Sequence, residues 1–89
     1  MYGTIRIGQA PAAQVEILVE CPATGSRQAL RTRAVTDSRG SFSLRVQASG
    51  RCLMRVRRDA LQGEPFEVFV ADNPIRFDVV LDNELKRVR

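Results

Sequence analysis

Short segments in which apolar and polar residues alternate recur along the chain, and this alternation limits its fold more than any other feature. Between residues 14 and 21, for example, the odd-numbered positions are apolar, whereas Glu16 and Glu20 lie on the other face. A period of two is typical of half-buried β-strands, because successive side chains of a strand point to opposite faces. No segment keeps the period of 3.6 that an amphipathic helix would show. We therefore expect an all-β protein.

Clusters of Gly, Pro, Asp, Asn and Ser separate the alternating segments, as turns do between short strands. Seven short strands joined by such turns favour a β-sandwich or barrel. We expect one domain over residues 1–89, with a single helical turn at residues 59–62 and a tail that extends the last strand or frays. The expected strands are residues 3–7, 14–21, 27–35, 41–47, 51–58, 66–70 and 75–82.

The size of the chain restricts where a functional site can lie. A domain of 89 residues buries about 60–65% of the surface that its unfolded form exposes, so a deep enclosed pocket is not expected. A site is expected instead on a sheet face, a loop cluster or a strand edge. Apolar runs are too short for a membrane span, and the first residues lack the apolar stretch of a signal peptide. The chain is thus either a cytosolic protein or an exported domain whose leader was removed.

The charge balance is basic, with a net charge of +4 and 13 arginines against one lysine. A basic surface can attract nucleic acids or other anionic polymers. Codon bias is the plainer explanation of the arginine excess, and acidic residues are spread among the arginines. Nucleic-acid binding also favours exposed aromatic side chains between the basic ones, and these are few. We do not expect a nucleic-acid partner.

The residue types exclude several kinds of chemistry. A chain without histidine cannot form Ser-His or Cys-His catalytic pairs. Two cysteines that are not spaced as CxxC cannot make a zinc site. An enzyme with a carboxylate pair would need two of the C-terminal acids to converge, and solvated charge is the simpler interpretation of these. We expect no enzyme activity, metal or cofactor. The acids concerned are Asp72, Asp78, Asp82 and Glu84.

A turn motif in the middle of the chain carries a family resemblance. Residues 36–44 read TDSRGSFSL, in which Thr36, Asp37 and Gly40 define a tight turn. Together with GTI at residues 3–5 and APA at residues 10–12, this pattern resembles the carboxypeptidase regulatory-like family. The resemblance implies a seven-stranded Greek-key sandwich of the transthyretin-like kind. It also implies an exported, periplasmic or secreted protein with a binding or spacer role and no shared catalytic residue.

The same resemblance leads to a hypothesis for the two cysteines. In a transthyretin-like topology the second and fifth strands are antiparallel neighbours, so Cys21 can lie opposite Cys52. This register brings inward residues opposite inward residues, and we expect a disulfide and an oxidising compartment. Two separate buried thiols are the alternative. The expected opposite pairs are Val19 with Met54, Ile17 with Val56, and Glu16 with Arg57.

An outer sheet face is the expected interaction surface. Leu18, Leu53 and Phe69 point outward from the second, fifth and sixth strands, which the family topology places side by side. A contiguous apolar patch of this kind is typical of a docking site, here for a second copy or a neighbouring domain.

Three arginines of the fifth strand, Arg51, Arg55 and Arg57, share this outer face. An anion or polysaccharide surface is one interpretation, and a solvated face paired with Glu16 and Glu20 is the plainer one. Carbohydrate binding is the alternative function, although it favours exposed aromatic rings and the chain has only Tyr2 and four phenylalanines.

Overall fold

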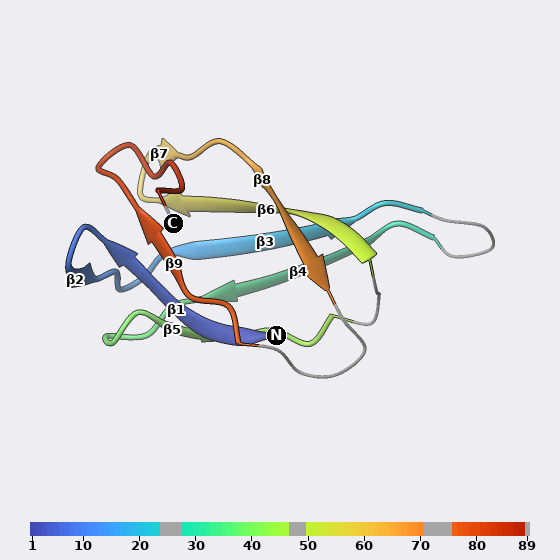
Figure 1. The fold of residues 1–89 in the computed structure, drawn as a ribbon, viewed down its shortest axis with the longest axis horizontal. Helices are drawn as coiled ribbons and strands as arrows, with labels where there is room; N and C mark the ends of the chain where they lie inside the picture. Colours follow the sequence, from blue (N-terminus) through green and yellow to red (C-terminus); the bar gives the residue numbers. More distant parts are fainter. Residues whose placement is uncertain (24–27, 47–49, 71–75, 89) are drawn as a thin grey trace.

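The computed structural model describes residues 1–23, 28–46, 50–70 and 76–88. These residues form strands and connecting turns, with no helix among them. The strands belong to two sheets that pack face to face, as expected of a sandwich (Figure 1). They are β1 (Tyr2–Ile7), β2 (Ala10–Pro11), β3 (Glu16–Cys21), β4 (Leu30–Val35), β5 (Ser41–Ser43), β6 (Gly50–Arg58), β7 (Leu61–Gln62), β8 (Phe66–Val70) and β9 (Val79–Leu81).

The smaller sheet is built around β1. One edge of β1 pairs antiparallel with β5 at residues 2–4 and with β2 at residues 6–7. Its other edge pairs with β9, and this pairing is parallel, with Ile5 opposite Val79 and Ile7 opposite Leu81. The first and last strands of the chain therefore lie side by side, at the front of the view in Figure 1. We call β1, β2, β5 and β9 the small sheet.

The larger sheet runs in the order β4-β3-β6, and all its pairings are antiparallel. The nine residues of β6 are long enough to pair with β3 along one edge and with both β8 and β7 along the other. We call these five strands the large sheet. It contains the second, fifth and sixth expected strands as direct neighbours, as the sequence analysis expected.

The core lies between the two sheets and consists of the residues that the alternation places inward. On β3 the inward side chains are 0–4% exposed, and on β6 they are 0–2% exposed. The edge strand β4 differs, because Leu30, Thr32 and Ala34 are only half-buried there. The largest fully buried side chains are those of Ile5, Ile17, Met54, Leu81, Leu85, Val15, Val19, Val56 and Val79.

The turn motif joins the two sheets. The buried Thr36 hydroxyl donates to the Ala12 carbonyl (2.6 Å) and accepts from the Val15 amide (2.9 Å). Gly40 has a φ of 74°, and a Cβ there would collide with the Ile5 carbonyl and the Ala12 amide. Asp37 lies outside the core, where its carboxylate accepts hydrogen bonds from two backbone amides. The motif is thus explained by packing and backbone geometry.

The C-terminal residues fold back along the outer edge of β9. The Val88 amide donates to the Val80 carbonyl (2.8 Å), and Leu85 is buried at 1% exposure. The Arg87 guanidinium lies over the rings of Phe66 and Phe77, 5.3 and 5.0 Å from their centroids. Because Phe66 belongs to the large sheet and Phe77 precedes β9, this arginine links the two sheets at their edge. The expectation that the tail extends the last strand or frays was wrong.

Several expected boundaries also need correction. The helical turn at residues 59–62 was wrong: Asp59 has a φ of 54° in a tight turn, and β7 follows. The first, fifth and sixth expected segments match β1, β6 and β8 to within one residue, but β4 begins only at Leu30, β5 ends at Ser43 and β9 covers only three residues. Residues 27, 47 and 75, where three expected strands began or ended, lie outside the described residues. The pairs β1–β2 and β6–β7 add two strands that were not expected.

Candidate functional site

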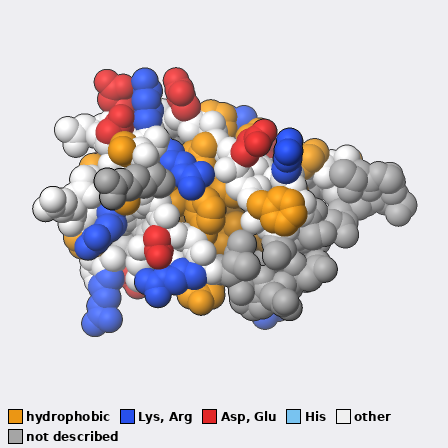
Figure 2. Space-filling model, viewed as in Figure 1, with side chains coloured by type: hydrophobic (Ala, Val, Ile, Leu, Met, Phe, Trp, Pro, Cys, Tyr) orange, Lys and Arg blue, Asp and Glu red, His pale blue; other side chains and the backbone are white. Residues whose placement is uncertain are grey.

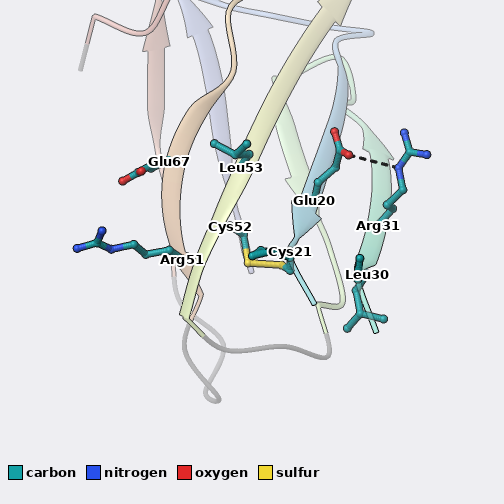
Figure 3. A pocket seen from close by; sticks show the side chains of 10 residues that line it. Glu20, Cys21, Leu30, Arg31, Arg51, Cys52, Leu53 and Glu67 are labelled. Atoms are coloured by element: carbon teal, nitrogen blue, oxygen red, sulfur yellow. Dashed lines mark ion pairs between the residues drawn. A yellow bond between two sulfur atoms is a disulfide. The ribbon is translucent and has the colours of Figure 1, made fainter. Parts of the chain in front are cut away.

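A disulfide between Cys21 and Cys52 joins β3 to β6, as the sequence analysis expected (Figure 3). The two Cα atoms are 4.4 Å apart, which is the spacing of directly opposite residues that share no ladder hydrogen bonds. The expected register of β3 against β6 is confirmed, because Val19 lies opposite Met54 and Ile17 lies opposite Val56. Both cysteines are buried, at 4% and 2% exposure. The bridge therefore belongs to the core and closes one end of the large sheet.

The three outward apolar residues lie on neighbouring strands of the large sheet. Phe69 is 64% exposed and Leu53 is 39% exposed, whereas Leu18 is half-buried. None of the three is directly opposite another, because Leu18 faces Arg55 across the ladder and Phe69 faces Arg51. They are diagonal neighbours, about 7–8 Å apart at Cα. The expected patch is thus a diagonal apolar stripe with charged residues on both sides.

Glutamates of β3 neutralise part of the arginine cluster on this face. Glu20 pairs with Arg55 at 2.8 Å and with Arg31 at 3.6 Å. Glu16 lies opposite Arg57 as expected, yet its ion pair is with Arg33 of β4, at 3.3 Å. Such pairs contribute little to stability where both groups are solvated.

The remaining two arginines of the expected face differ from Arg55. The Arg57 Nε group donates to the Asp59 carbonyl at 3.4 Å, which holds this side chain toward the β6–β7 turn. Arg51 lies opposite Phe69, and Figure 3 shows its side chain directed away from the disulfide on the same side as Glu67. An exposed arginine beside an exposed aromatic ring is a combination common at protein interfaces.

A cavity of about 430 Å³ lies at the end of the large sheet, beside the disulfide. Its apolar wall includes the two cysteines, Leu30 and Leu53. Figure 3 shows the Glu20–Arg31 ion pair on one side of this end and Glu67 with Arg51 on the other. This cavity was not expected from the sequence, because it lies where ends of β3, β4 and β6 come together and no local pattern marks it.

The C-terminal acids have separate partners. Asp78 accepts from the Thr4 hydroxyl (2.9 Å) and amide (3.1 Å) and pairs with Arg76 at 3.0 Å. The hydrogen bond from Thr4, followed by the charge of Arg76, lowers the pKa of Asp78. Asp82 accepts from the amides of residues 84 and 86, each at 2.9 Å. Glu84 pairs with Lys86 at 3.4 Å, and Asp72 lies outside the described residues.

The side of the molecule that carries the small sheet is chemically mixed. Figure 2 shows basic and acidic side chains interspersed across it, with apolar surface gathered near the middle. Over the described ranges, no three Cys, Asp or Glu side chains come together as a metal site would require. The described residues contain no helix that is long and apolar enough to cross a membrane.

Comparison with known proteins found no matching protein-family model, no matching curated protein and no matching solved structure.

Proposed function

We propose that this chain is an exported, non-catalytic β-sandwich module of the transthyretin-like, carboxypeptidase regulatory-like kind, and that it binds protein through the outer face of its large sheet. The observation that carries the proposal is Phe69, an aromatic side chain of β8 that is 64% exposed. Burying such a ring against a partner would remove a large apolar area from water. Arg51 beside it supplies a second residue type that often anchors interfaces.

Two further features support the family and the compartment. The order β3-β6-β8 agrees with the neighbours that the transthyretin-like topology implies for the second, fifth and sixth expected strands. Disulfides persist mainly in oxidising compartments, so the Cys21–Cys52 bridge supports a periplasmic or secreted location.

A protein partner fits this face better than a carbohydrate. Sugar rings are commonly held by stacking on exposed aromatic side chains. The two exposed aromatic residues, Tyr2 and Phe69, belong to different sheets and so do not form one stacking surface. The diagonal apolar stripe with its flanking charges instead resembles the mixed surface of a protein interface.

Site-specific photo-crosslinking in the native cell tests the proposal. A photoreactive phenylalanine analogue replaces Phe69 in one variant and Tyr2 in a matched control on the other sheet. We expect a discrete protein adduct from position 69 and none from position 2, with the partner identified by mass spectrometry. A dimer of the chain itself would identify a second copy as the partner. Identical adducts from both positions, or none from position 69, would contradict the proposed face.

A further inference from the structure

The edge of β4 is the longest strand edge that the described residues leave uncovered. β4 has six residues and pairs with β3 alone among the described strands. The other described strands with a free outer edge are shorter: β2 and β7 have two residues each, β5 has three and β8 has five. In Figure 1, β3 and β4 continue to the right beyond the start of β1. A row of unpaired backbone groups can template pairing with another chain.

The hydrogen-bond alternation shows which groups face outward. The Thr36 amide donates to the Val15 carbonyl at 3.0 Å, so residue 36 is bonded toward β3. Hydrogen-bonded and non-hydrogen-bonded pairs alternate along an antiparallel ladder. Residues 36, 34, 32 and 30 are therefore bonded toward β3. The amides and carbonyls of the residues between them, Arg31, Arg33 and Val35, face the free edge. The disulfide spacing on β3 agrees with the same alternation, because Cys21 is bonded toward β4 and not toward Cys52.

The inner face of β4 is also incompletely covered. Leu30, Thr32 and Ala34 are half-buried, whereas the neighbouring inward residues of β3 are almost completely buried. The apolar cavity beside the disulfide begins at Leu30, at the end of the same edge. An added strand would therefore cover apolar surface on its inward side as well as pair with the free backbone groups.

The charges on β4 select the partner. Arg31 and Arg33 are 68% and 66% exposed on the outward side, even with their ion pairs to β3. A second copy pairing antiparallel along most of β4, with the two outer faces on the same side, would place arginine opposite arginine. Like charges directly opposite each other are destabilising, so self-pairing is disfavoured. An acidic strand would instead place carboxylates next to these arginines.

We propose that the β4 edge binds an extended segment of a partner protein in which apolar residues alternate with Asp or Glu. The segment adds as a further strand to the large sheet, with its apolar side chains over Leu30 and Ala34 and its acidic side chains beside Arg31 and Arg33. This inference rests on the proposed role in protein binding, but it assigns a different surface from the Phe69 face and a defined partner chemistry.

Amide NMR of the disulfide-bonded chain tests the inference with two capped six-residue peptides, one of alternating valine and glutamate and one of alternating valine and lysine. We expect the glutamate peptide to shift the amide signals of Arg31, Arg33 and Val35 and to slow their hydrogen exchange. The lysine peptide should leave them unchanged. Equal binding of both peptides, or no shift with either, would overturn the inference. Shifts confined to Leu53 and Phe69 would overturn it while supporting the proposed outer face.

Three variants separate the charge from the backbone. Arg33→Gln keeps the amide and removes the charge, and we expect about threefold weaker peptide binding. Arg33→Pro also removes an edge amide that the ladder does not use, a substitution that edge strands tolerate, and binding should be lost. Arg57→Gln, on the same face but on β6, should bind as the natural chain does. Unchanged peptide binding by both Arg33 variants would overturn the inference. If the proline variant does not fold, unchanged binding by Arg33→Gln would overturn it.

Discussion

Different kinds of contact stabilise each of the two sheets of this sandwich. The large sheet has long strands, repeated cross-strand pairs, ion pairs across its outer face and a disulfide. The small sheet has strands of two, three and three residues beside β1, and it depends on single contacts from turns and from the C-terminal residues. Stability in the large sheet is therefore spread over many similar contacts. In the small sheet, the loss of one buried hydrogen-bonding group removes a larger share of the stabilising contacts.

Removing the disulfide should have the largest effect, because it is the one strong single contact of the large sheet. The bridge spans a sequence separation of 31 residues, which corresponds to about 3–4 kcal/mol of stabilisation on the chain-entropy model. We expect the double variant Cys21→Ala with Cys52→Ala to lose this amount in urea unfolding. The natural chain measured with a reductant serves as the control for lost packing. A change below about 1 kcal/mol in both samples would contradict the assigned role of the bridge.

Thr36→Val should show how strongly the fold depends on one buried side chain in the turn between the two sheets. The substitution leaves the Val15 amide and the Ala12 carbonyl without their buried partner, and we expect a loss of about 2 kcal/mol in the free energy of unfolding. The same chemical change at Thr32, a half-buried position on β4, is the matched control and should cost under about 0.5 kcal/mol. Equal effects at the two positions would remove the contrast between this junction and the extended ladder of the large sheet.

Asp37→Asn should have the smallest effect, and the size of this effect depends on pH. Hydrogen bonds from the Ser41 and Arg39 amides lower the pKa of Asp37 below its ordinary value of 3.8. The ionised carboxylate therefore stabilises the fold above pH 3.8, and this contribution is lost as the pH falls through the lower folded-state pKa. We expect the natural chain to melt above the variant at neutral pH, with the difference shrinking in acid. A difference in melting temperature that does not change with pH would exclude this role of the charge.

The register of the large sheet could be predicted because period-two patterns restrict it strongly. A shift of one residue would turn Ile17 and Val19 to solvent, so only even shifts were compatible with a buried face. The pairing of Cys21 with Cys52 then selected one of them. The same reasoning identified Leu18, Leu53 and Phe69 as outward residues on adjacent strands.

The small sheet was less predictable because its contacts are not periodic. Strands of two residues, such as β2 and β7, are too short to show alternation. The burial of Leu85 depends on a φ of 61° and on close packing against Gly63, and neither leaves a sequence pattern. The ion pair of Glu16 with Arg33 was missed for another reason: a strand has two neighbours, and opposite charge alone does not distinguish them.

The parallel pairing of β1 with β9 bears on the order in which the chain can fold as it is synthesised. All strands of the large sheet are available once β8 has left the ribosome, whereas one edge of β1 remains unpaired until β9 has been synthesised. Thr4 and Asp78, which meet at this seam, are 74 residues apart. Contacts between such distant residues form slowly, because the loop between them must close first. A ribosome-bound chain that lacks β9 should therefore hold a formed large sheet over a core still open on one side.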